Sequence, residues 1–167
     1  YPPWWLDNMK LHFPRGYHIE PGGGRRMPTA GFGSGVHNYA TNDPAGQIAR
    51  DYLQKRGVSE EAIRLFRLGC APDAWDDTVN WARHKGYDLS LVEQAGLVLR
   101  KEGTDHYYDR LRGRLMFPIA DEQGRTIAFS GRVLSGDEKT AKYVNSPETP
   151  IFTKGRVCYG LDKSRRA

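Results

Sequence analysis

The chain of 167 residues is 38% hydrophobic and 27% charged, with a formal net charge of +5 at pH 7. This length suits one domain, and the longest apolar run is far too short to span a membrane. We expect a cytoplasmic protein, because no secretory signal opens the sequence and the two cysteines show neither metal-ligand spacing nor a disulfide framework.

The positive charge is concentrated in the second part of the sequence. Residues 1–96 carry 11 Lys or Arg and 11 Asp or Glu, whereas residues 97–167 carry 14 and 9. A basic region fits a polyanionic partner better than an acidic one, but an excess of this size also occurs on ordinary solvated surfaces. The charge therefore corroborates a nucleic-acid partner without identifying one.

Residues 1–46 are rich in Gly, Pro and aromatic residues and keep neither a helical nor an alternating period. We expect an arm or linker of unknown role here, separate from a domain over residues 47–167. A protein-interaction arm is an alternative, although packing of its aromatic residues on the domain's own helices is favoured. The anchors of such an arm would be Trp4, Trp5, Phe13 and Tyr17.

Four short helices are predicted next. Asp43 is a candidate cap for the first helix, which begins at Pro44 and closes at Gly57. Ser59 begins the second helix with capping chemistry. The third and fourth helices are expected at residues 78–85 and 90–95. Two tryptophans of this helical part are expected in its core or as a lid over it, namely Trp75 and Trp81.

From Leu97 onward the pattern changes to short runs of β-branched and aromatic residues. Strands are expected at residues 97–99, 107–108, 114–119, 126–133 and 141–144. Hairpin turns are predicted at residues 121–124 and 135–137. We therefore expect an α+β fold, with small helices followed by a twisted, mainly antiparallel sheet that leaves one face in water. Its core should include Met116, Phe117 and Ile119.

One polar stretch near the C-terminal end, residues 142–155, contains lysines, an aromatic ring, an amide and hydroxyls interleaved with two prolines. Lys142 and Lys154 can neutralise phosphates, and Tyr143 can stack on a base or sugar. Asn145 and Ser146 can hydrogen-bond phosphate oxygens. Composition alone slightly favours an ordinary solvated turn over this nucleic-acid interpretation.

Three arginines upstream are further candidates. Arg112 and Arg114 are two positions apart, so both would point to one face of a strand, toward water or phosphate. Arg132 follows Gly131, and a glycine in a strand marks a bulge or a close approach of the backbone. The Arg132 guanidinium could bind a phosphate or pair with a carboxylate such as that of Glu148.

The polar stretch resembles a signature of the bacterial DnaG-type DNA primases. Further matching blocks stand in the family's order at residues 52–59, 112–119, 129–134 and 159–161. The resemblance covers residues 47–167 and implies the N-terminal subdomain of the primase RNA polymerase domain, with the sheet side facing the template. It also implies template or nucleotide binding by Arg56, Arg132, Lys142, Tyr143, Asn145, Ser146 and Lys154.

The resemblance implies a DNA-directed RNA polymerase, a nucleotidyltransferase of the primosome that makes short RNA primers for DNA replication. The expected partners are a single-stranded DNA template, an RNA–DNA hybrid, ribonucleoside triphosphates and, in the full-length protein, the replicative helicase. The family binds Mg²⁺ in a Toprim domain and zinc in an N-terminal ribbon, and this sequence matches neither. We therefore expect no catalytic residue and no bound metal here, and no polymerisation by this chain alone. The alternative is a non-catalytic single-stranded-DNA-binding module, or a decoy, derived from a primase.

Overall fold

The computed structural model describes residues 44–134 and 139–164. The candidate cap Asp43, the aromatic anchors of the predicted arm and the predicted turn at residues 135–137 lie outside the described residues. The elements in chain order are α3 (Pro44–Lys55), α4 (Glu60–Leu65), β1 (Gly69–Ala71), α5 (Asp77–His84), α6 (Leu89–Gln94), β2 (Val98–Arg100), β3 (Tyr107–Asp109), β4 (Arg114–Ala120), β5 (Thr126–Val133), β6 (Tyr143–Asn145), a 3-10 helix (Lys154–Arg156) and α7 (Leu161–Ser164).

The helices follow from local chemistry. Ala49 and Leu53, one turn apart on α3, are fully buried, so the predicted apolar face packs inward. The Ser59 hydroxyl accepts a hydrogen bond from the Ala62 backbone N–H at 3.1 Å and caps α4, as its sequence predicts. The predicted third and fourth helices are confirmed as α5 and α6, each shifted by about one residue.

A four-stranded antiparallel sheet with strand order β1-β4-β5-β6 forms the centre of the molecule, and β2 pairs separately with β3. This arrangement confirms the α+β class and the predicted strands. Strand β1 was not predicted, because its three residues carry no alternation and only their pairing with β4 makes them a strand. The turn between β4 and β5 is confirmed, with Gly124 at φ 79° and its N–H donating to the Asp121 carbonyl at 2.9 Å.

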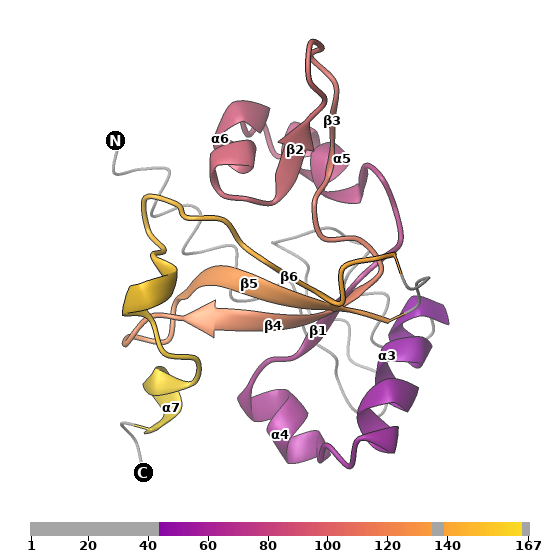
Figure 1. Ribbon diagram of the computed structural model, residues 1–167, viewed down its shortest axis with the longest axis vertical. Helices are drawn as coiled ribbons and strands as arrows, with labels where there is room; N and C mark the ends of the chain where they lie inside the picture. Colours follow the sequence, from indigo (N-terminus) through magenta and orange to yellow (C-terminus); the bar gives the residue numbers. More distant parts are fainter. Residues whose placement is uncertain (1–43, 135–138, 165–167) are drawn as a thin grey trace.

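Both faces of this sheet are covered, so the expectation of one wet face is wrong. Figure 1 shows the sheet across the middle, with α5, α6 and the β2–β3 hairpin above it and α3 and α4 below it. Two clusters of buried hydrophobic residues lie on the two faces of the sheet, and we call them the upper core and the lower core. Met116 of β4 belongs to the upper core, and its neighbour Leu115 belongs to the lower core. The nearly continuous apolar run of β4 reflects this double burial, as in strands that have no solvated face.

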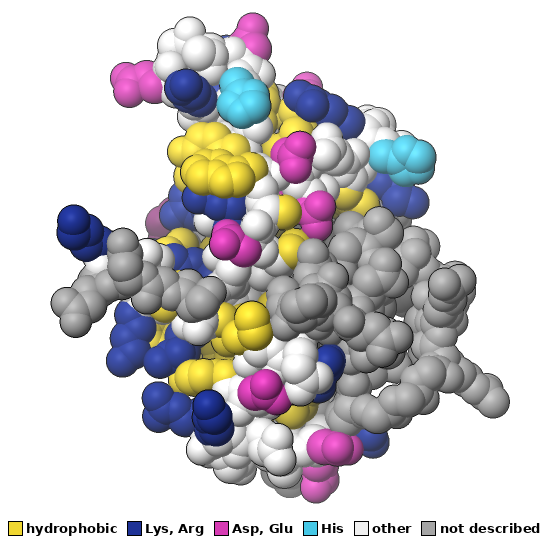
Figure 2. All heavy atoms as spheres, turned by 90° about the vertical axis from the view of Figure 1, so that its right-hand side faces the viewer, with side chains coloured by type: hydrophobic (Ala, Val, Ile, Leu, Met, Phe, Trp, Pro, Cys, Tyr) yellow, Lys and Arg dark blue, Asp and Glu magenta, His cyan; other side chains and the backbone are white. Residues whose placement is uncertain are grey.

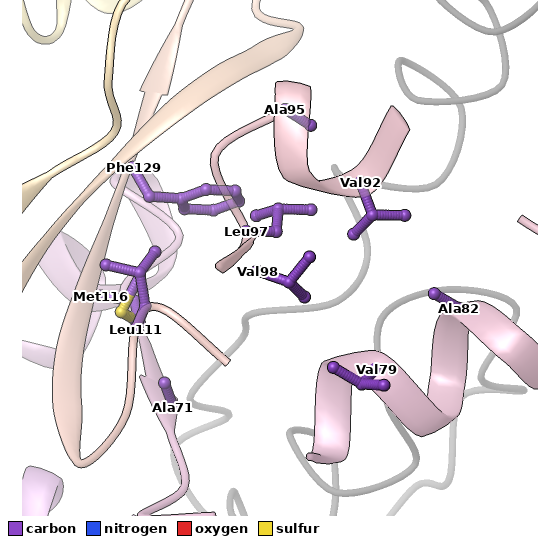
Figure 3. Packing of buried hydrophobic residues seen from close by; sticks show 10 residues of the cluster. All are labelled: Ala71, Val79, Ala82, Val92, Ala95, Leu97, Val98, Leu111, Met116 and Phe129. Atoms are coloured by element: carbon purple, nitrogen blue, oxygen red, sulfur yellow. The ribbon is translucent and has the colours of Figure 1, made fainter. Parts of the chain in front are cut away.

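The upper core joins the sheet to the small helices. In Figure 3 the Phe129 ring points from β5 toward Leu97, while Val79 and Ala82 contribute from α5. Met116 is fully buried, as predicted, whereas Phe117 and Ile119 are only half-buried. Both residues lie on the same face of β4 as Leu115, and that face is covered less completely at these two positions than at Leu115.

The predicted packing of the two tryptophans of the helical part is half correct. Trp81 is partly buried against the upper core, as expected. Trp75 is 64% exposed, so its assignment to a core or lid is wrong. Trp75 precedes α5 in a connecting segment, where no helical face turns it inward.

Asp109 fastens the β2–β3 hairpin to α5. Its carboxylate is buried and accepts hydrogen bonds from the backbone N–H groups of Thr78 at 2.7 Å and Val79 at 3.1 Å. Burial raises the pKa of Asp109 above its ordinary value, and these donors partly oppose that shift. Because Asp76 makes no side-chain capping bond, Asp109 caps the helix from a distant strand.

Of the described helices, none is long and apolar enough to cross a membrane.

Candidate nucleic-acid interface

The strands bring their basic residues to one end of the sheet. Ala71 of β1 pairs with Arg114 of β4, which pairs with Val133 of β5, and Arg132 pairs with Tyr143 of β6. The end of β1, the start of β4, the end of β5 and the start of β6 therefore lie together. We call this surface the strand-end face and define it by Arg56, Arg112, Arg132, Lys142 and Tyr143.

Figure 2 views the molecule from the right-hand side of Figure 1, where the strand-end face lies. On the left-hand half of that view, several Lys and Arg side chains lie among hydrophobic side chains, with a few Asp and Glu side chains between them. Lys142 belongs to this surface because its carbonyl accepts a hydrogen bond from the Val133 N–H at 3.0 Å. Its side chain is exposed. Cations interleaved with rings are typical of surfaces that bind single-stranded nucleic acid.

A stack of guanidiniums and rings forms the centre of this surface. The Arg132 guanidinium carbon lies 4.4 Å from the centre of the Tyr52 ring and 5.9 Å from that of Tyr143. The Arg56 guanidinium carbon lies 5.4 Å from the centre of the same Tyr52 ring. These contacts join α3 to β5 and β6 and hold the guanidiniums at the surface. Tyr143 is 56% exposed, so much of its ring is accessible to a ligand.

Arg132 does not make the carboxylate pairing that the sequence left open. The Glu148 carboxylate accepts instead from the Lys154 backbone N–H at 3.0 Å. Within the described part of the chain, Arg132 donates to the Val133 carbonyl at 3.2 Å, and no ion pair joins it to a carboxylate. Its positive charge thus remains available to an anionic ligand.

Arg112 and Arg114 do not form a row on one strand face, so that prediction is wrong. Arg112 precedes β4, and Gly113 between them has φ 58°, which turns the chain out of the strand. Arg112 lies over the exposed Trp75 ring at 3.6 Å. Arg114 is buried, and its guanidinium donates to the carbonyls of Ala141 at 2.9 Å and Gly131 at 3.3 Å.

Arg114 consequently stabilises the backbone of the interface from a buried position. Burial, and to a smaller extent the nearby Arg112 charge, lowers the pKa of Arg114 from its ordinary value. The hydrogen bond to Ala141 holds the segment that leads into β6, and therefore the neighbouring Lys142. Arg114 therefore acts at this interface by holding the backbone beside Lys142.

Gly131 makes room for this buried arginine. A Cβ at Gly131 would lie 2.9 Å from Cδ of Arg114 and 3.3 Å from Sδ of Met116. The close approach that the sequence suggested at this glycine is therefore confirmed, and its neighbour is a side chain of the same sheet.

The polar loop after β6 is fixed from within. Ser146 is 1% exposed, and its hydroxyl accepts from the Phe129 N–H at 2.9 Å while its own N–H donates to the Phe129 carbonyl at 2.8 Å. Ser146 therefore positions the loop, and a phosphate contact by its hydroxyl is not supported. Asn145, which pairs with Ser130, has an exposed side chain and remains a candidate contact.

Lys154 lies apart from the other candidates. It begins the 3-10 helix that follows the loop and is exposed. This helix lies at the left of Figure 1, beside α7 and away from the strand-end face. The sequence placed Lys142 and Lys154 in one motif, but the structure does not bring them together.

Three aromatic residues of this region were not singled out as binding candidates from the sequence, namely Tyr52, Trp75 and Tyr108. The contacts of Trp75 with Arg112 and of Tyr52 with Arg132 join residues far apart in the chain, so no local spacing pointed to them. Tyr108 lies four positions before Arg112, and its contact depends on the same fold. Among the described residues, no group of three or more His, Cys, Asp or Glu side chains is arranged to hold a metal ion.

The chain was compared with known proteins. The family model for the N-terminal domain of the DNA primase catalytic core matches residues 36–165. A DNA primase of Deinococcus radiodurans is 50% identical over 117 residues, which are 70% of this chain and 20% of that protein. The chain thus spans about a fifth of the length of this curated relative.

Solved structures give the same result. The primase catalytic core of E. coli superposes with a TM-score of 0.71 and 41% identity, covering 80% of this chain and 41% of that one. A DnaG primase catalytic domain bound to single-stranded DNA has a TM-score of 0.63 and 44% identity, covering 75% and 38%. The resemblance to DnaG-type primases is confirmed, and this chain belongs to the family of N-terminal domains of the DNA primase catalytic core.

Proposed function

We propose that this chain is the part of a DNA primase that holds the single-stranded DNA template. The observation that carries the proposal is the stack of Arg56, Tyr52, Arg132 and Tyr143 on the strand-end face. Its guanidiniums can neutralise phosphates, and the exposed Tyr143 ring can stack on a base. The binding of single-stranded DNA by a DnaG catalytic domain of the same fold supports this assignment.

The role is one of positioning within a DNA-directed RNA polymerase that synthesises RNA primers. Phosphoryl transfer depends on charge stabilisation and on alignment of the template and the incoming nucleotide. The strand-end face supplies cations and rings for alignment, and we assign no catalytic residue to it. In the complete enzyme we expect this surface to contact the template and the short RNA–DNA hybrid. Ribonucleoside triphosphates and the replicative helicase would be partners of the whole protein.

The exposed lysines test this function. Lys142→Ala is expected to weaken binding of an oligonucleotide of about four nucleotides and to reduce the slope of log K against log salt by about 1. Lys154→Ala is expected to weaken binding only of a longer strand, of about 16 nucleotides, because it lies beside α7. Neither change should lower the melting temperature appreciably, since both side chains are exposed.

Fluorescence anisotropy with labelled oligonucleotides measures both effects. Lys101→Ala is the matched control, because Lys101 is an exposed lysine at the β2–β3 hairpin, away from the strand-end face. It should bind as the unaltered chain does. Equal losses for Lys101→Ala and Lys142→Ala would show that only net charge matters and would contradict the assigned surface.

A further inference from the structure

Arg67 is the only residue other than glycine with a left-handed backbone in the described part of the chain, with φ 52°. It stands directly after the end of α4, where its N–H donates to the Arg64 carbonyl at 3.1 Å. The next N–H, that of Leu68, donates to the Ile63 carbonyl at 3.0 Å. This pair of hydrogen bonds ends many helices, and glycine normally takes the left-handed position. An arginine here carries backbone strain, which points to a role for its side chain.

The Arg67 side chain reaches the turn between β4 and β5. Its guanidinium donates to the Gly124 carbonyl at 2.8 Å, across 57 positions of the chain. This turn lies at the end of the sheet opposite the strand-end face, beside α7 at the lower left of Figure 1. A Cβ at Gly124 would lie 3.6 Å from Oδ2 of Asp162, so α7 packs against the same turn. Arg67 thus joins α4 to the turn on which α7 rests.

Two rings and an ion pair complete this junction. The Phe66 ring centre lies 5.6 Å from that of Tyr159, with an interplanar angle of 16°. Lys163 Nζ lies 5.5 Å from the centre of the Phe66 ring and 2.6 Å from Oδ2 of Asp162. We call this group the α7 clasp and define it by Phe66, Arg67, Gly124, Tyr159, Asp162 and Lys163.

The α7 clasp is continuous with the 3-10 helix that carries Lys154 and Arg156. Residues 157 and 158 alone separate this helix from Tyr159 of the clasp. Both cationic side chains are exposed, and no ion pair within residues 44–134 and 139–164 engages either of them. The direction in which this helix presents its cations therefore depends on where the clasp holds Tyr159.

We propose that Arg67 is a positioning residue, which fixes α7 to the β4–β5 turn and thereby orients Lys154 toward a longer single strand. The Arg67 guanidinium is directed at the Gly124 carbonyl, so it acts through Lys154 and not on the nucleic acid itself. Glycine at this position would relieve the backbone strain but would lose the contact with the turn. This role rests on the proposed function and concerns only strands that extend beyond the strand-end face.

A nitroxide label on Cys158 tests the clasp without any nucleic acid. Cys158 is exposed and Cys70 is buried, so the label attaches to Cys158 in the folded chain. Electron paramagnetic resonance is expected to show restricted motion of the label in the unaltered chain and freer motion in Arg67→Gly. Arg67→Lys keeps a donor and should restore part of the restriction. The matched control is Arg64→Ala, because Arg64 is an exposed arginine of α4 outside the clasp.

Fluorescence anisotropy tests the effect on binding. Arg67→Gly is expected to weaken binding of an oligonucleotide of about 16 nucleotides roughly two- to fivefold and to leave binding of one of about four nucleotides unchanged. In a chain that already carries Lys154→Ala, Arg67→Gly should cause no further loss, because the two residues act as one unit. Its melting temperature should not fall appreciably, since glycine suits the left-handed backbone.

The possible outcomes separate this inference from the proposed function. Unchanged motion of the label in Arg67→Gly would overturn the clasp and leave the proposed function standing. An equal loss of binding with and without Lys154 would also overturn it, as would a large fall in melting temperature, which would make Arg67 merely structural. If the unaltered chain binds neither oligonucleotide, the proposed function fails together with the role of Arg67 in binding. The nitroxide would still decide whether Arg67 holds α7.

Discussion

Gly96→Ala is expected to lower the free energy of unfolding by about 2–4 kcal/mol. Gly96 follows α6 with φ 76°, a left-handed conformation that L side chains rarely adopt. A Cβ there would also lie 2.4 Å from Cδ of Pro147. Because the proline ring is rigid, the loop after Ser146 would have to move away from the α6–β2 turn.

Gly86→Ala is the matched control for this prediction. Gly86 follows α5 with φ 74°, and its N–H donates to the Arg83 carbonyl. The Gly96 N–H donates in the same way to the Glu93 carbonyl. A Cβ at Gly86 would meet nothing within 4 Å. Its replacement should therefore cost only the backbone strain, about 1–2 kcal/mol. Urea denaturation measures both variants, and equal losses would show that the contact with Pro147 adds nothing.

Arg114→Ala is expected to lower the free energy of unfolding by about 2–4 kcal/mol and to weaken binding of single-stranded DNA. The change removes a buried stem that packs beside Gly131 and leaves the Gly131 and Ala141 carbonyls without these donors. The segment before β6 would lose its anchor, and Lys142 would be less well positioned. Arg114 would thus affect binding without touching the ligand.

Arg114→Met distinguishes the contribution of the stem from that of the hydrogen bonds. Methionine keeps much of the apolar volume and donates no hydrogen bond, so a smaller loss of about 1–2 kcal/mol is expected. Denaturation and anisotropy on both variants check this order. Full stability of Arg114→Ala, or DNA binding unchanged in both variants, would contradict the positioning role.

The sequence predicted well those elements that have a local cause. Capping by Ser59, the turn at Gly124 and the alternating strands β4 and β5 each arise from neighbouring residues, and each is confirmed. Strand β1 has no such local signal, since it becomes a strand only by pairing with a partner more than 40 residues away. The burial of both sheet faces likewise depends on helices that approach from two sides.

The candidate site was less predictable, because side-chain type does not reveal exposure. Arg114 and Ser146 have the chemistry of phosphate contacts, yet tertiary packing buries both as structural anchors. Trp75 has the chemistry of a core residue, yet it lies at the surface over Arg112. The resemblance to primases pointed to residues at this end of the sheet. Only the register of the strands separates the exposed candidates among them from the buried residues that hold them in place.

The central claim is that the strand-end face binds single-stranded DNA through phosphates and bases. Its most direct test is titration of a labelled oligo(dT) with the unaltered chain at about 50 mM and about 200 mM salt, followed by anisotropy. We predict saturable binding whose affinity falls steeply between these concentrations, because each phosphate contact releases counterions. The absence of binding at micromolar protein, or an affinity that does not change with salt, would contradict the account.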